Sequence, residues 1–241
     1  MDRATVVVRI ADPLRFLLSV GNRRGEVTVP VDGVSSLVHI VESLGVPRTE
    51  IGELRVGGRP APLDARPGPG DLIEVLPVRR PQRTADPRFV LDVHLGTLAR
   101  WMRLLGIDTA YRNDASDPEL AAQSTAEGRI LLSRDRGLLQ RRAVASGGYV
   151  RATRPGEQLD EVLDRFDPPL SPWTRCLSCN GLVEAVPKEQ IAHLLPPGTR
   201  RTFDRFSRCA GCQRLYWPGA HAPRLDAIVA RATGRARPDG T

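Results

Sequence analysis

The sequence predicts an α/β protein of three parts, and three observations along its 241 residues indicate this. The first third alternates β-branched runs with one amphipathic stretch, and the middle third alternates short apolar runs with helical patterns, which is typical of a parallel sheet. The last third holds all four cysteines, in two Cys-X-X-Cys pairs that favour a metal site. We expect a first domain at 1–78, a linker at 79–87, a second domain at 88–170, a metal-binding module at 171–225 and a tail at 226–241.

The first domain is expected to contain four strands and one helix. Apolar residues at helical spacing between Val34 and Leu44 predict the helix, which ends at Gly45. A short sheet that clasps a single helix is a β-grasp, so the sequence predicts this fold. The expected strands are Thr5–Ile10, Glu26–Val29, Leu54–Val56 and Leu72–Leu76.

One stretch of this domain, Pro69-Gly-Asp-Leu-Ile-Glu-Val75, resembles the ubiquitin-like sulfur-carrier proteins. Those carriers act through a free C-terminal Gly-Gly, whereas this chain continues into Pro77-Val-Arg-Arg-Pro81. The resemblance therefore implies the fold and not the carrier chemistry. A protein partner that docks on the β-grasp domain is a further expectation.

Prolines at 81 and 87, with charges between them, predict the linker. Beyond it, strands and helices alternate, which predicts a parallel sheet covered by helices on both faces, in three α/β/α layers. The expected strands are Phe89–Asp92, Asp108–Tyr111, Ile130–Ser133 and Gly148–Thr153, and the expected helices are Gly96–Leu105, Pro118–Glu127, Arg136–Arg142 and Gly156–Phe166.

Acidic residues follow the apolar strands of the second domain. Asp92 and Asp135 come at the carboxyl ends of two strands, and Asp114 and Asp117 follow the strand between them in sequence. The carboxyl ends of parallel strands meet at one edge of a sheet, where ligands bind. Carboxylates held together there repel one another unless a cation joins them, and oxygen ligands suit Mg²⁺ or Mn²⁺. The pattern indicates a metal site that activates water and clamps a phosphodiester.

Each carboxylate except Asp92 also has an ordinary structural explanation. Asp117 precedes Pro118 and fits a helix N-cap, and Asp135 fits the cap of the helix after it. Asp114 is a common turn residue. A carboxylate directly after a strand core is either solvated at the sheet edge or a ligand, and for Asp92 we favour the ligand.

Cys176, Cys179, Cys209 and Cys212 are predicted to bind zinc. Two cysteines three positions apart on a tight turn grip one ion, and a second such turn completes a closed Cys₄ shell that serves structure. The alternative is a redox disulfide within one pair, which requires the motif to follow a strand of a βαβ unit.

The net charge of +7 lies mainly at the cysteine-containing end, where residues 171–241 carry 11 Arg/Lys and 5 Asp/Glu. Such a basic module attracts polyanions, of which nucleic acid is the commonest in the cytoplasm, although a compositional preference for arginine is an alternative. Arg100 and Arg103, expected opposite the apolar face of their helix, and Arg134 are candidate RNA contacts or ordinary solvated side chains. With no membrane-spanning run and no secretory signal, we expect a cytoplasmic protein without a membrane partner.

Three segments together resemble the Mut-seven C-terminal RNase domain family: Phe89–Asp108, Tyr111–Asp114 and Gly128–Leu139. The two cysteine pairs and Leu215–His221 also match, so the resemblance covers about 88–225, with the ubiquitin-like module before it. It implies a PIN-like fold, an appended zinc ribbon and metal-dependent RNA cleavage. By position, Asp92, the Asp114/Asp117 group and Asp135 match the acidic residues of PIN-like nucleases, and a fourth position is not assigned.

The leading hypothesis is therefore a Mg²⁺- or Mn²⁺-dependent ribonuclease whose basic zinc ribbon assists RNA binding. The alternative is a non-catalytic RNA-binding or ribosome-associated module, in which the carboxylates serve as caps and the β-grasp domain docks a protein. The sequence leaves open which RNA is cut, whether cleavage is internal or from an end, the number of metals and the oligomeric state.

Overall fold

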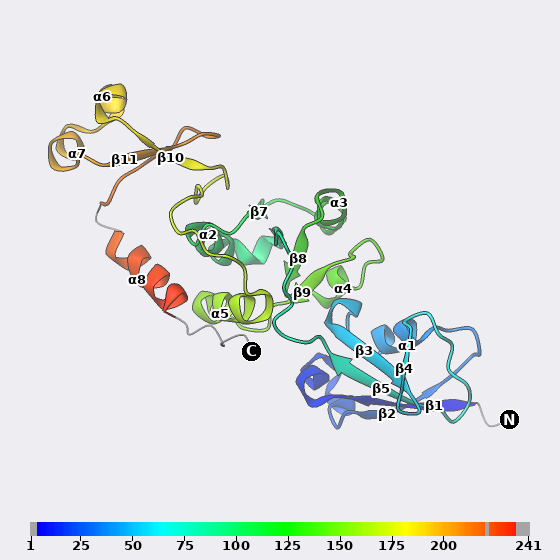
Figure 1. Cartoon of the computed structure of the whole chain (residues 1–241). Coiled ribbons are helices and arrows are strands. Elements are labelled where there is room, and N and C mark those ends of the chain that lie inside the picture. Colours follow the sequence, from blue (N-terminus) through cyan, green and yellow to red (C-terminus); the bar gives the residue numbers. More distant parts are fainter. Residues whose placement is uncertain (1–3, 220–221, 235–241) are drawn as a thin grey trace. The chain divides into compact units, whose positions relative to one another are not determined.

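The computed structural model describes residues 4–219 and 222–234 (Figure 1). The chain divides into two compact units, one made of residues up to 82 together with 116–151, and the other of 83–115 together with 152 onward. Among the described helices, none has the length and apolar character required to cross a membrane. His221, the last residue of the 215–221 motif, lies outside the described residues.

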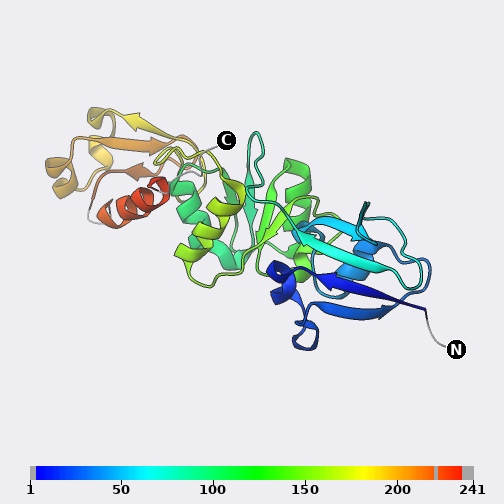
Figure 2. The same ribbon diagram turned by 60° about the horizontal axis from the view of Figure 1, so that its bottom comes forward.

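The N-terminal domain confirms the β-grasp prediction. Its five strands lie in the order β2-β1-β5-β3-β4 and form the blue-to-cyan sheet of Figure 2. Strand β1 runs antiparallel to β2 and parallel to β5. Helix α1 (Leu37–Ser43) begins after the Ser36 N-cap, and the core lies between it and the sheet. The strands are β1 (Thr5–Ile10), β2 (Glu26–Pro30), β3 (Ile51–Val56), β4 (Arg59–Ala61) and β5 (Leu72–Pro77).

Strand β4 is the element of this domain that the sequence prediction omitted. Gly57 and Gly58 both have positive φ and form a two-residue turn, so β4 folds back antiparallel on β3. Paired glycines are typical of such hairpin turns. β4 is an edge strand of the sheet, and an edge strand tolerates Pro60 because one of its sides needs no N–H for pairing.

The β-grasp domain contacts the segment that contains β8 (Ile130–Ser133), α4 (Arg136–Leu139) and β9 (Gly147–Tyr149). The Glu50 carboxylate, 5% exposed, accepts a hydrogen bond from the Tyr149 N–H at 2.8 Å. Arg136 donates to the Leu17 carbonyl, and Gln140 Nε2 donates to the Glu42 carbonyl at 2.9 Å. These hydrogen bonds, each with a backbone group as one partner, therefore fasten the β-grasp domain to this segment. The same unit also contains α3 (Asp117–Glu127), which packs on β8.

The second unit contains the other half of the parallel sheet. Strand β6 (Phe89–Leu91) pairs in parallel with β7 (Thr109–Tyr111), as β8 does with β9, and the strand order through the sheet is β7-β6-β8-β9. Helix α2 (Gly96–Leu104) packs on β7 and on α5 (Pro155–Phe166). The predicted α/β class with a parallel sheet is confirmed.

The cysteine-containing module is a three-stranded antiparallel sheet in the order β10-β11-β12. Its small core contains Val186, Ile191, Leu195 and Phe206. The elements are β10 (Val183–Val186), α6 (Lys188–Ile191), α7 (Pro197–Thr202), β11 (Phe206–Cys209) and β12 (Leu215–Tyr216).

The tail expected at 226–241 is instead helical as far as it is described. Helix α8 (Ala222–Thr233) begins before position 226, and Arg231 on its last turn donates to the Gly156 carbonyl and pairs with Asp160 on α5. The polar composition of this stretch gave no clear signal of the helix.

Candidate functional site

Asp92 lies directly after β6, whose three residues are all fully buried. The Asp92 residue is itself only 4% exposed, and its carbonyl accepts the Leu95 N–H at 2.9 Å as the chain enters a short 3₁₀ turn. The turn is held from the neighbouring strand, because the Tyr111 hydroxyl donates to the Val93 carbonyl at 2.9 Å. The Asp92 side chain thus lies at the carboxyl end of a buried strand and is nearly excluded from water.

Asp135 follows β8 and is the N-cap of α4. Its Oδ1 accepts the Gly137 N–H at 2.7 Å, and its own N–H donates to Ser133 Oγ at 2.8 Å. The capping role that the sequence left open is therefore present. The second carboxylate oxygen accepts no hydrogen bond within the described part of the chain, so capping leaves one ligand atom available.

Asp114 and Asp117 lie in exposed positions. The Asp114 side chain is 79% exposed and lies 3.8 Å from the Arg112 guanidinium, while Asp117 lies 3.5 Å from Arg141. The expectation that Asp117 is the cap of α3 is wrong, because the cap is Ser116. Ser116 and Glu119 form a capping box, in which the Glu119 carboxylate accepts the Ser116 N–H at 2.8 Å.

The candidate RNA contacts Arg100 and Arg134 are exposed, and neither guanidinium forms an ion pair with another described residue. Arg103 is different, and the expectation that it lies on the solvated face of α2 is wrong. It is 4% exposed, and its Nε donates to the Thr109 carbonyl at 2.8 Å while one terminal nitrogen donates to the Ser178 carbonyl at 2.8 Å. Arg103 thus fastens the cysteine module to α2 and β7.

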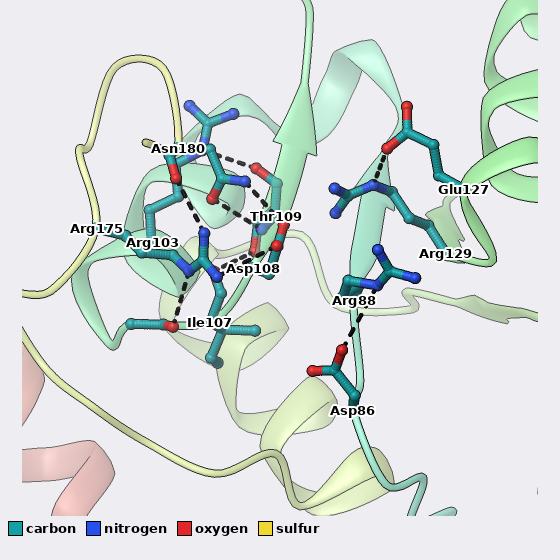
Figure 3. Close-up of polar contacts among 11 residues, drawn as sticks. Asp86, Arg88, Arg103, Ile107, Asp108, Thr109, Glu127, Arg129, Arg175 and Asn180 are labelled. Atoms are coloured by element: carbon teal, nitrogen blue, oxygen red, sulfur yellow. Dashed lines mark hydrogen bonds and ion pairs between the residues drawn. The ribbon is translucent and has the colours of Figure 1, made fainter. Parts of the chain in front are cut away.

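Further polar contacts support this attachment, as Figure 3 shows. The Asn180 side chain accepts the Thr109 N–H at 3.0 Å and donates to Asp108 Oδ1 at 2.8 Å. Arg175 lies 3.2 Å from the other Asp108 oxygen and also donates to the Gly106 carbonyl at 3.2 Å. Nothing in the spacing of these residues along the sequence indicated that they converge.

The four cysteines form one cluster, with one sulfur of each within 4.8 Å of all the others. The Sγ atoms of Cys176 and Cys212 are 3.6 Å apart, and those of Cys179 and Cys209 are 3.4 Å apart. A disulfide would require about 2.05 Å, whereas ligands of a tetrahedral zinc at about 2.3 Å lie about 3.8 Å from one another. The cluster therefore fits a single tetrahedral metal ion and does not contain a disulfide.

Each Cys-X-X-Cys pair forms a tight turn, here called a knuckle, and the two knuckles have the same backbone geometry. In each, the N–H of the second cysteine points to the sulfur of the first at 3.4 Å, and the next residue, Asn180 or Gln213, takes positive φ. That residue donates its N–H to the carbonyl of the first cysteine, at 3.0 Å for Asn180 and 3.1 Å for Gln213. Backbone N–H groups aimed at sulfur stabilise thiolates, which are the metal-binding form.

Tyr216 is a residue of this site that the sequence did not indicate as a neighbour of the cysteines. Its hydroxyl lies 3.0 Å from Cys176 Sγ and accepts the Leu177 N–H at 3.1 Å. Burial raises the pKa of Cys176, but the Tyr216 hydroxyl and the knuckle N–H groups outweigh it and lower the pKa to about 6. Burial and the bond to Cys176 in turn raise the pKa of Tyr216, so the hydroxyl stays a donor.

Two family models match this chain, one in its N-terminal third and one over most of the remainder. Residues 87–229 match the Mut7-C RNAse domain, and residues 3–83 match the Mut7-C ubiquitin domain. The chain therefore belongs to the Mut7-C RNAse domain family. The Mut7-C RNAse match extends over the four cysteines and most of α8, so these belong to the family's domain and are not a separate addition.

No curated protein matches the chain. Among solved structures, the crystal structure of SAMP1 from Haloferax volcanii is similar at 18% sequence identity and a TM-score of 0.26, covering 32% of this chain and 97% of SAMP1.

Proposed function

We propose that this Mut7-C chain is a Mg²⁺- or Mn²⁺-dependent ribonuclease in which Asp92 and Asp135 bind the metal. What supports the proposal is membership of an RNase domain family together with one observation: Asp92 is a 4% exposed carboxylate at the carboxyl end of a fully buried strand. Asp92 follows β6 and Asp135 follows β8, and each of these strands belongs to a parallel pair. Ligands of open parallel sheets bind beyond such strand ends.

The donor set suits a hard divalent cation, because it consists of carboxylate oxygens with no sulfur or imidazole. A bound Mg²⁺ or Mn²⁺ supplies charge that activates water for attack on phosphorus and stabilises the departing oxygen. Asp92 contributes a nearly buried charge, and Asp135 contributes the oxygen that its cap leaves available. Asp114 and Asp117, exposed and paired with arginines, are proposed to assist from the periphery.

RNA binding is proposed to involve Arg100 and Arg134, whose exposed guanidinium groups suit phosphate contacts. Arg103 is left out of this set because its donors are used by carbonyls. The basic ribbon is proposed to add further phosphate contacts through Arg200, Arg201, Arg205 and Arg208, and zinc is proposed as the ion of the Cys₄ cluster.

The test is the effect of charge removal at the two aspartates. Asp92→Asn or Asp135→Asn keeps the shape of the side chain, so each variant should bind RNA as the wild type does but cleave it at least about a hundredfold more slowly. Cleavage is measured on a labelled single-stranded RNA, with Mg²⁺ or Mn²⁺ added back to protein freed of weakly bound divalent ions.

The matched control is Asp86→Asn, because Asp86 is an 85% exposed aspartate whose ion pair among the described residues is with the nearby Arg88. The double variant of Asp92 and Asp135 should be scarcely slower than either single one, since residues that serve one metal act as a unit. Wild-type cleavage by both folded single variants would contradict the proposal and favour the non-catalytic RNA-binding module.

A further inference from the structure

A groove of about 790 Å³ lies on the cysteine-containing module, and none of the four cysteines lines it. Its walls come from the segment before the first knuckle, from β11 and β12 and from the start of α8. The side chains that matter here are Trp173, Arg205, Tyr216, Trp217 and Asp226. Of the residues named in the proposed function, only Arg205, a proposed phosphate contact, lines this groove.

Two tryptophans give the groove large exposed aromatic faces. Trp173 is 41% exposed and Trp217 is 37% exposed, so neither belongs to the small buried core of the module. Trp217 is held by Phe206, with the ring centroids 6.4 Å apart. An exposed, positioned indole is a stacking surface, since a π-face attracts other planar rings.

The backbone of Trp173 is strained, which adds to this argument. Its φ is 67°, in a region where a bulky residue costs about 1–2 kcal/mol relative to its usual conformation. The conformation is fixed by a hydrogen bond from the Trp173 N–H to the Leu104 carbonyl at 2.9 Å. Strain of this kind persists where the surrounding structure imposes it, and it concentrates at binding sites.

The charges of the groove indicate the chemistry of the ligand. Arg175 is used by the Asp108 and Gly106 contacts, but Arg205 is exposed and forms no ion pair or hydrogen bond with any other described side chain. The groove thus offers aromatic faces, one available guanidinium and, in Asp226, one acceptor for an amino group. The module around it carries a net charge of +6 over residues 171–241, which attracts an anionic chain.

We infer that this groove binds an unpaired nucleobase of single-stranded RNA, stacked on Trp173, with Arg205 on the adjoining phosphate. Planar bases on an anionic backbone match aromatic faces beside a guanidinium, the combination that single-strand binders use. Bases in a duplex are stacked on their neighbours and present no free face, so the groove selects unpaired RNA. The inference rests on the proposed ribonuclease function for the nature of the substrate.

The experiment measures the affinity of the full chain for a labelled, unstructured ten-nucleotide RNA, with Asp92→Asn present to prevent cleavage. Trp173→Ala should weaken binding about 5- to 150-fold, because stacking on one base contributes about 1–3 kcal/mol. The slope of affinity against salt should stay unchanged, since no phosphate contact is lost. Arg205→Ala should reduce that slope by about one counterion, and Trp173→Phe should keep most of the affinity.

An abasic version of the same RNA separates base stacking from phosphate binding. It should bind to the parent protein about as weakly as the intact RNA binds to Trp173→Ala, and a blunt duplex of the same sequence should behave likewise. The Trp173 variants must retain the metal content and the melting transition of the parent. If intact and abasic RNA bind equally, or if folded Trp173→Ala binds as the parent does, the inference is wrong.

Cleavage by the chain with Asp92 intact separates this inference from the ribonuclease proposal. RNA cleavage with no effect of Trp173 on binding overturns the groove and leaves the ribonuclease. Binding that depends on Trp173, without any cleavage, supports the groove and overturns the ribonuclease. Absence of both binding and cleavage overturns both.

Discussion

The β-grasp domain and the cysteine-containing module are attached to the RNase segment through similar contacts but differ in what holds each of them together. Each attachment uses one nearly buried charged residue that forms hydrogen bonds with backbone groups across the contact. Glu50, 5% exposed, accepts the Tyr149 N–H, and Arg103, 4% exposed, donates to the Ser178 carbonyl. The β-grasp core, however, contains 13 buried apolar residues among those described, and the core of the cysteine module contains four.

The difference indicates that the two domains obtain their stability from different sources. Burial of a fully covered Val, Leu or Ile contributes about 1.5–3 kcal/mol, so the β-grasp core can offset the entropy of its own folding. Four such residues cannot do so for the cysteine module, and small modules of this kind depend on a metal. A metal ion at the Cys₄ cluster is therefore expected to supply the folding free energy that a larger apolar core supplies in the β-grasp domain.

The largest expected effect comes from loss of the metal. Cys176→Ser should unfold residues 171–219, because the binding free energy of structural zinc, about 10 kcal/mol or more, is also folding free energy. Residues 4–77 should keep their protection. Hydrogen exchange read peptide by peptide measures both regions in one experiment.

Ser178→Ala is the matched control, since Ser178 is exposed within the same knuckle and contributes no sulfur. The variant should keep one metal per chain and normal protection. If Cys176→Ser protein, shown to lack the metal, still protects β10 and β11 from exchange, the module has enough core of its own and the comparison fails.

Substitution of Arg103 should have the next largest effect on the free energy of unfolding, because it weakens the attachment of the cysteine-containing module without removing a metal ligand. Arg103→Leu leaves the carbonyls of Thr109, Leu177 and Ser178 without their donor, which should cost about 2–5 kcal/mol in the free energy of unfolding. Arg103→Lys should lie in between, because one ammonium cannot reach both sides of the contact as a planar guanidinium does.

Both variants should still bind one metal ion per chain, which distinguishes a weakened attachment from a disrupted cluster. Denaturant unfolding and metal analysis are the two measurements. A cost below about 1 kcal/mol for Arg103→Leu would mean that Asp108, Asn180 and Arg175 hold the module without it.

Arg103 also illustrates the limit of prediction from this sequence. The helical spacing of Leu98 and Met102 predicted α2 almost to its ends, and the same spacing placed Arg103 opposite the apolar face. In the structure the buried face is wider, because the first knuckle covers a side of α2 that a single amphipathic helix would leave in water. A contact between residues 103 and 178 leaves no local signal in either segment.

The same reasoning explains which parts of the candidate site were predictable. The Cys₄ cluster follows from the spacing of two pairs, and Asp92 and Asp135 follow from strands that local composition defines. The Tyr216 hydroxyl beside Cys176 depends on how two knuckles meet, so no spacing indicates it. Asp117 was mistaken for a cap because Ser116 and Glu119 form a capping box that fixes the helix start one residue earlier.

Glu50 should have the smallest effect, and it tests the other attachment. The Glu50→Gln variant keeps an oxygen that can accept the Tyr149 N–H, so only the charge assistance is lost, about 1 kcal/mol in the free energy of unfolding. Point substitution is preferred to deletion of the domain, which would also remove the partners of Arg136 and Gln140. Glu50→Ala, which leaves the part-buried Tyr149 N–H without this acceptor, should cost more, about 1–3 kcal/mol, and neither change should alter metal content. If Glu50→Gln equals Glu50→Ala, the carboxylate acts through its charge and not through this hydrogen bond, and the two attachments are less alike than their geometry indicates.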